Sequence, residues 1–145
     1  MKRSVFLILL LIGLPLVACA GGEAEAAEQT VRLIARDIEY DTEVLEVTAG
    51  APVHLTLANE GALDHDFSIE HIPLAGEAVA EHEEEMDEHE MSMEEEDLAL
   101  HLSAAAGESE TITFTPSEPG EYEFFCTVPG HGEAGMAGTL IVSEP

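Results

Sequence analysis

The stretch that decides the fold is residues 120–136, which read GEYEFFCTVPGHGEAGM. In its first half Tyr122, Phe124 and Cys126 share one parity, and Glu121 and Glu123 take the other. Side chains alternate between the two faces of a β-strand, so this pattern predicts a strand with one face on a core. The thiol of Cys126 should then point inward with the aromatic rings. The second half is rich in glycine and contains Pro129, which predicts a loop after the strand.

This loop carries three side chains that bind soft metals. Cys126, His131 and Met136 follow one another at intervals of five residues, and His65 lies upstream near the start of another predicted strand. Two imidazoles and a thiolate, with a weak axial thioether, make the blue-copper electron-transfer site. Thiolate and thioether favour Cu(I), whereas imidazole accepts both oxidation states. The residues therefore predict one type I copper that cycles between Cu(I) and Cu(II).

Each of these residues also has a purely structural interpretation. Cys126 could be a buried core thiol, and Met136 could fill the core instead of acting as an axial ligand. His65 and His131 could be ordinary turn and loop residues. Three further histidines are expected to be structural and not ligands: His54, on the solvent side of its strand, His71 and His101.

Short alternating segments separated by glycine and proline recur along the rest of the chain. Six to eight short strands with such punctuation predict an all-β sandwich or barrel. No long apolar segment of helical period competes with this interpretation outside one acidic region. The expected strands include residues 31–33, 44–47, 53–57, 67–69, 98–102, 112–114, 122–126 and 140–142.

On these residues the sequence resembles the cupredoxins, the type I copper family of plastocyanin, azurin, auracyanin and sulfocyanin. The resemblance rests on His65 within residues 59–67, on the strand 120–126, and on the loop 126–136 followed by GTLIV at 138–142. It covers residues 30–145 apart from an insert. It implies a cupredoxin-like Greek-key β-sandwich.

The resemblance also implies a role for each residue of the site. Cys126, His65 and His131 would be the equatorial copper ligands, and Met136 would be the long axial ligand. The ring edge of His131, flanked by small residues, would be the electron port. Asp66 follows the first histidine where plastocyanin-like and azurin-like members often have asparagine. The bond by which that residue ties the two ligand loops together is therefore in question.

The charge of the chain is strongly negative. Thirty-one acidic residues against four basic ones give a net charge of −27. A nucleic-acid binder needs a basic surface, so that class is excluded. Twelve of the acidic residues lie in residues 76–97, which we call the acidic insert.

The acidic insert has three interpretations. It could be a solvated acidic arm. On a helix, four of its residues would form one stripe that could bind auxiliary copper. The charge could also attract redox proteins with a basic docking surface, such as a cytochrome c, an oxidase or a reaction centre. The four residues of the stripe are His82, Met86, His89 and Met93.

The first residues have the pattern of an export signal. Lys2 and Arg3 precede an apolar run over residues 5–17, which is too short to span a bilayer. The LVAC sequence at 16–19 resembles a bacterial lipoprotein box, which implies that Cys19 becomes lipidated after removal of residues 1–18. Ordinary cleavage near Ala20 is the alternative.

Residues 19–29 would then be a flexible tether to the cupredoxin domain at 30–145. The lipid would anchor the protein at the outer face of the cell membrane or in the periplasm. We therefore expect an electron carrier between membrane-associated redox partners and not an enzyme. The chain has no His-x-His pair for a multicopper oxidase, and its single loop cysteine does not suit a binuclear copper site. An extracytoplasmic copper chaperone or storage protein is the alternative.

Overall fold

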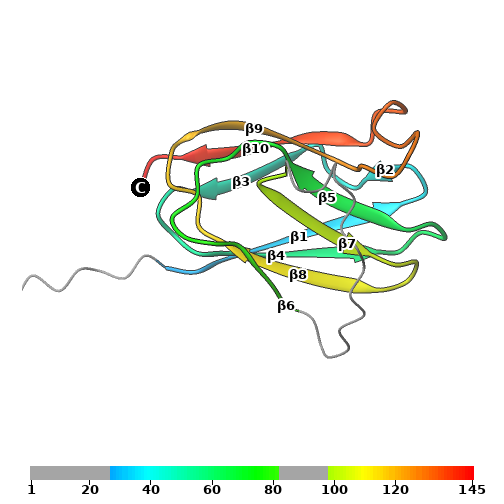
Figure 1. The fold of residues 1–145 in the computed structure, drawn as a ribbon, viewed down its shortest axis with the longest axis horizontal. Helices are drawn as coiled ribbons and strands as arrows, with labels where there is room; N and C mark the ends of the chain where they lie inside the picture. The colour runs from blue at the N-terminus through cyan, green and yellow to red at the C-terminus, as the bar shows by residue number, and fades with distance from the viewer. Residues whose placement is uncertain (1–26, 82–97) are drawn as a thin grey trace, which may run out of the picture.

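The computed structural model describes residues 27–81 and 98–145, which form ten strands and no helix (Figure 1). The strands make two five-stranded sheets. The all-β sandwich expected from the alternating segments is confirmed. The strands are β1 (Gln29–Arg36), β2 (Glu39–Tyr40), β3 (Val44–Thr48), β4 (Val53–Asn59), β5 (His65–Ile69), β6 (Val79–Glu81), β7 (Leu100–Ala104), β8 (Ser109–Phe114), β9 (Gly120–Phe125) and β10 (Ala137–Ser143).

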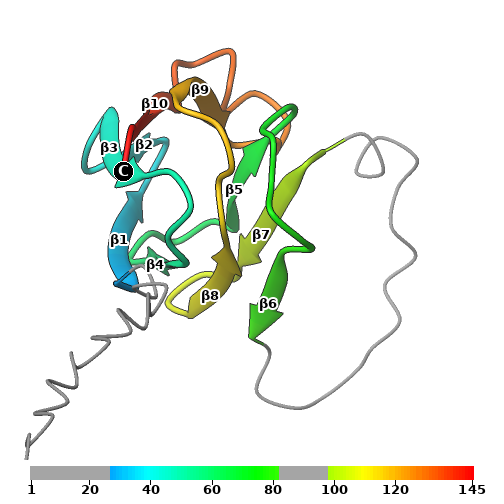
Figure 2. The ribbon, with the colours of Figure 1, turned by 90° about the vertical axis from the view of Figure 1, so that its left-hand side faces the viewer.

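The two sheets pack face to face, as Figure 2 shows in a view along the strands. The first sheet has the order β2-β1-β4-β8-β6, and the second has the order β3-β10-β9-β5-β7. Strand pairs β1–β4 and β3–β10 are parallel, and the other pairs are antiparallel. Within the described residues no helix is long and apolar enough to cross a membrane.

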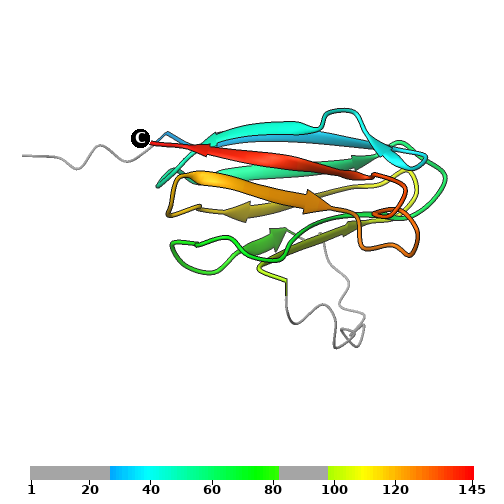
Figure 3. The same ribbon diagram turned by 90° about the horizontal axis from the view of Figure 1, so that it is seen from above.

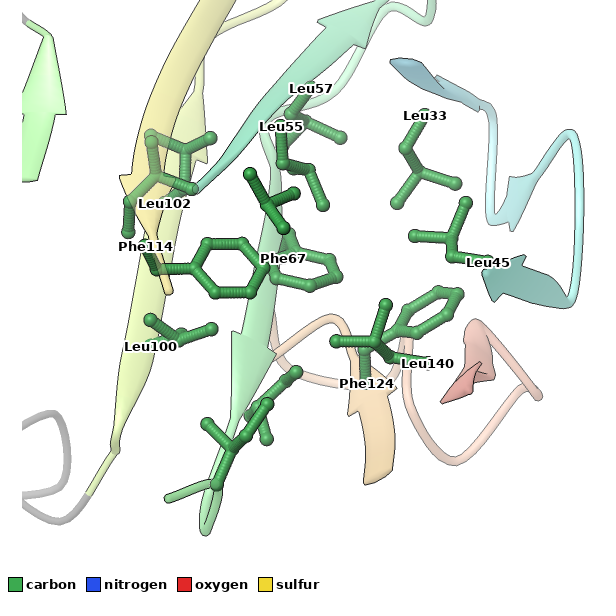
Figure 4. Packing of buried hydrophobic residues seen from close by; sticks show 14 of the residues in the cluster. Leu33, Leu45, Leu55, Leu57, Phe67, Leu100, Leu102, Phe114, Phe124 and Leu140 are labelled. Carbon is green, nitrogen blue, oxygen red and sulfur yellow. The ribbon is translucent and has the colours of Figure 1, made fainter. Parts of the chain in front are cut away.

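The core lies between the sheets and is built from the inward-facing residues of both. In β4, Val53, Leu55 and Leu57 are fully buried, as their spacing predicted. Phe67 and Phe124 pack ring to ring with their centroids 5.3 Å apart (Figure 4). Burial of such large apolar side chains is the main favourable term in folding, so these residues fix how the sheets are stacked.

The predicted parity of β9 is confirmed. Phe124 is fully buried, Tyr122 is half-buried against the core, and Glu121 and Glu123 are exposed. Cys126 follows the last residue of this strand and is 2% exposed. The strand therefore brings Cys126 to one end of the core. The loop that connects β9 to β10 lies at this end of the sandwich (Figure 3).

Two of the ten strands lie outside the expected segments. β2 is a two-residue strand after the turn that ends β1. β6 falls inside the predicted acidic insert and pairs with β8, with Ala80 opposite Ile112. The alanines at 78 and 80 pack against the core while Val79 is exposed, which is the alternation of an edge strand. The first residues of the acidic insert therefore form an edge of the first sheet.

Gly138 in β10 leaves room for the Phe124 ring of the neighbouring strand β9. A Cβ atom at this position would lie 2.3 Å from Cζ of Phe124 and 2.7 Å from the backbone oxygen of Glu43. We expect Gly138→Ala to lower the free energy of unfolding by about 1–3 kcal/mol, because the core ring or a backbone must move. Urea denaturation measures this change. Ser143→Thr adds a methyl group at an exposed position of the same strand and is the control; equal losses in both variants would contradict the packing argument.

Candidate metal centre

Three metal-binding side chains meet at one end of the core. His65 is the first residue of β5, Cys126 follows β9, and His131 lies in the loop between β9 and β10. One ligand atom from each lies within 4.8 Å of the others. The Cys126 sulfur is 3.5 Å from Nδ1 of His131, and the two imidazole centroids are 5.0 Å apart. All three residues are buried. Their mutual distances show that the fold brings together three of the four predicted ligands.

The His65 ring has unpaired polar atoms. Both of its nitrogens are buried and neither has a hydrogen-bond partner within the protein. A buried polar atom without a partner costs free energy, so such an atom calls for an explanation. A metal ion bound by one ring nitrogen would supply a partner. Together with a thiolate and a second imidazole, this donor set fits copper.

Burial shifts the pKa values of two of these groups. Burial and the neighbouring His131 lower the pKa of His65, against the opposing effect of nearby aspartates. Burial raises the pKa of the Cys126 thiol, while backbone hydrogen bonds from Asp66 and Val128 favour its thiolate. The His65 ring is therefore held neutral, which leaves a lone pair available for a metal.

Backbone hydrogen bonds set the spacing of the loop 126–136. The N–H of Cys126 donates to the carbonyl of Met136 (3.1 Å), and the N–H of Met136 donates to the carbonyl of His131 (3.0 Å). Gly130 and Gly135 have φ values of 88° and 99°, a region that residues with a Cβ rarely adopt. Met136 is fully buried and bonded through its backbone to two of the ligands. Its role as axial ligand stays a prediction.

A buried asparagine shapes the turn before His65. The amide of Asn59 donates to the carbonyls of Leu63 (2.7 Å) and Ala104 (2.9 Å) and accepts from the N–H of Gly61 (2.9 Å). A Cβ at Gly61 would lie 3.2 Å from Nε2 of His65, so glycine leaves room for the ring. Sequence reasoning did not assign Asn59 a role; an asparagine two residues before a glycine is its only signal.

Asp66 ties the two ligand-bearing segments together. The N–H of Thr127 donates to Oδ1 of Asp66 (2.8 Å), and its hydroxyl donates to Oδ2 (2.7 Å). The hydroxyl of Ser68 also donates to Oδ1 (3.1 Å), and the hydroxyl of Tyr40 donates to the backbone carbonyl of Asp66. The link that the sequence left in question is therefore present, with a carboxylate in place of an amide.

The other predicted residues lie elsewhere. Cys19, His82, Met86, His89 and Met93 are outside the described residues. His54 is half-buried and bonded to the hydroxyl of Thr113 (2.9 Å), with Glu28 at 3.7 Å, so it is less exposed than expected. His101 bonds Ser68 and His71 is exposed. In the described part of the chain, no second group of three histidine, cysteine or carboxylate ligands gathers.

Comparison with known proteins shows the family of this chain. The cupredoxin-like domain family model matches residues 7–142. The copper-resistant cuproprotein CopI of Rubrivivax gelatinosus is 31% identical over 122 residues, which cover 83% of this chain and 70% of the relative. Auracyanin-B of Chloroflexus aurantiacus is 55% identical over 46 residues, which cover 32% of this chain and 20% of the relative.

A solved structure shares the fold. Auracyanin A, a "blue" copper protein from the green thermophilic photosynthetic bacterium Chloroflexus aurantiacus, matches with a TM-score of 0.61. The match covers 81% of this chain and 100% of auracyanin A at 21% sequence identity. At that identity the likeness establishes the two-sheet architecture and leaves the chemistry to the residues of the site.

The lowered pKa of His65 predicts a pH dependence for the metal-free protein. Below the ordinary histidine value of 6.5, the unfolded chain takes up a proton that the folded chain resists. The free energy of unfolding should therefore fall as the pH drops from 7.5 to 5.5. Urea denaturation across this range should show a shallower fall for His65→Gln. The exposed His71→Gln is the control and should follow the wild type; identical pH dependence in all three proteins would contradict the assignment.

Proposed function

Because this chain belongs to the cupredoxin-like family, which binds one copper, we propose that it is a mononuclear blue-copper electron carrier. His65, Cys126 and His131 would hold the copper, with Met136 as the fourth, axial ligand. The observation that supports this function best is the buried thiol of Cys126, which lies close to two buried imidazoles. The bound copper would take up and release one electron by cycling between Cu(II) and Cu(I).

The protein frame supports this role because it holds the ligands without the metal. The turn before His65 is fixed by Asn59, and the Cys126 loop is fixed by its own backbone bonds and by Asp66. Ligands that do not rearrange when the charge of the copper changes permit fast electron transfer. His131 is 6% exposed, whereas His65 and Met136 are 0% exposed. The electron would therefore pass through the ring edge of His131, the most exposed of the four.

We propose an exported protein anchored through a lipid on Cys19, since residues 1–20 have the pattern of a lipoprotein signal. Its partners would be membrane-associated redox proteins. A net charge of −27 favours partners with a basic docking surface, because opposite charges speed encounter.

A second function is favoured by the likeness to a copper-resistant cuproprotein. In this alternative the protein is an extracytoplasmic copper chaperone or storage protein. The histidines and methionines of the acidic insert would then bind additional copper, since imidazole and thioether are ligands for copper. The two functions differ in how many copper ions each chain binds and in which residues bind them.

The absorption spectrum tests the carrier function. Wild-type protein loaded with Cu(II) should be intensely blue, because the Cys126 thiolate donates charge to the metal. Cys126→Ser should be colourless. The chain offers a matched control in its only other cysteine, and Cys19→Ser should keep the full colour. A colourless wild-type copper complex would contradict the proposal.

Copper stoichiometry separates the two functions. Residues 82–97 would be replaced with a glycine-serine linker of equal length, since β6 ends at Glu81 and must stay paired with β8. The carrier function predicts one copper per chain by elemental analysis in both proteins. Loss of most of the bound copper on replacement would favour the chaperone or storage function.

A further inference from the structure

We propose that Asp66 sets the redox preference of the site, because its fixed negative charge favours Cu(II) over Cu(I). The inference rests on the proposed copper function and adds a residue outside the ligand set. Asp66 would not touch the metal. It would act by its charge and by the segments it holds.

The position of Asp66 brings it close to both ligand-bearing segments. It directly follows His65 in β5, and its carboxylate holds Thr127, the residue after Cys126. Its backbone N–H hydrogen-bonds the Cys126 sulfur. Asp66 is 3% exposed, so solvent screens its charge weakly. A charge at this position acts on a metal held by His65 and Cys126.

Every hydrogen bond to the Asp66 carboxylate comes from a group that can donate a proton. Thr127 gives an N–H and a hydroxyl, and Ser68 gives a hydroxyl. A serine hydroxyl has one proton to donate, so when Ser68 donates to Asp66 its 2.9 Å bond with Nδ1 of His101 runs from the ring N–H to the serine oxygen. The Thr127 N–H can only donate and both hydroxyls are placed to donate, which suits an ionised carboxylate.

No cation in the described part of the chain forms an ion pair with Asp66. Arg36, one of two arginines after the first three residues, pairs with Glu60 at 2.6 Å on the surface. The hydrogen bonds therefore hold a negative charge without neutralising it. Such a charge stabilises the more positive ion, and Cu(II) carries one unit more than Cu(I). The site should favour the oxidised state more than a site with a neutral residue at 66.

The effect of the Asp66 charge can be separated from the effect of its hydrogen bonds to Thr127, because asparagine has nearly the same shape as aspartate. In Asp66→Asn the amide oxygen can accept the Thr127 N–H, and the amide NH₂ can donate to the Thr127 hydroxyl oxygen. The tie between the segments is kept and the charge is lost. The matched control is Asp64→Asn, on the other side of His65. Asp64 is exposed, and its carboxylate accepts from the N–H of Ala106 at 3.2 Å.

Redox titration of the copper-loaded full chain, followed at the blue band, tests the proposal. Asp66→Asn should shift the equilibrium toward Cu(I) by about tenfold or more, which raises the reduction potential by about 59 mV for each factor of ten. Competition with chelators should show a larger loss of Cu(II) binding than of Cu(I) binding. Asp64→Asn should shift the equilibrium less than about threefold, because solvent and salt screen an exposed charge.

Thr127→Val removes a hydroxyl donor and keeps the charge, so it should move the potential much less than Asp66→Asn. A blue Asp66→Asn protein with the wild-type potential would overturn the proposal, as would an equal shift in Thr127→Val. A wild type without the blue band would instead refute the copper function itself. If Asp66→Asn does not fold, Asp66→Ser is also neutral and is expected to raise the potential in the same way.

Discussion

The pair of hydrogen bonds from Thr127 to Asp66 holds the metal centre together. Within the described residues β5 and β9 share a single bridging pair, Ser68 with Phe125, and Asp66 and Thr127 follow it in the same antiparallel register. Without the bonds, His65 and Cys126 would sit on segments joined by one bridge. The carboxylate therefore fixes the distance between the two ligands, 61 residues apart in sequence.

The rest of the site follows from the way the sandwich ends. The core between the sheets is apolar up to Phe67 and Phe124. The next inward position of β5 belongs to His65, and Cys126 takes the next inward position just past the end of β9. The candidate metal centre therefore lies at the end of the core, where imidazole and thiol side chains take the place of apolar ones. A close-packed interior resists rearrangement, so the ligands are held in place before a metal arrives. Ligands that stay in place when the charge of the copper changes would permit fast electron transfer.

Much of this arrangement was predictable from sequence. The parity of Tyr122, Phe124 and Cys126 predicted an inward thiol, and the five-residue spacing placed Cys126 and His131 in one loop; the structure confirms both. The bond between Asp66 and Thr127 was left in question by the sequence, because it depends on the register of two strands distant in sequence. β6 was missed because the acidic composition of residues 76–97 hid a three-residue alternation.

If the rigid, buried set of His65, Cys126 and His131 holds one copper, that copper should carry one electron reversibly. A repeated redox cycle of the copper-loaded protein, followed at the blue band, tests this. We expect a one-electron titration in which reduction removes the band and reoxidation restores it fully, with one copper per chain throughout. A band that does not return, because the thiol is oxidised or the copper is released, would contradict it.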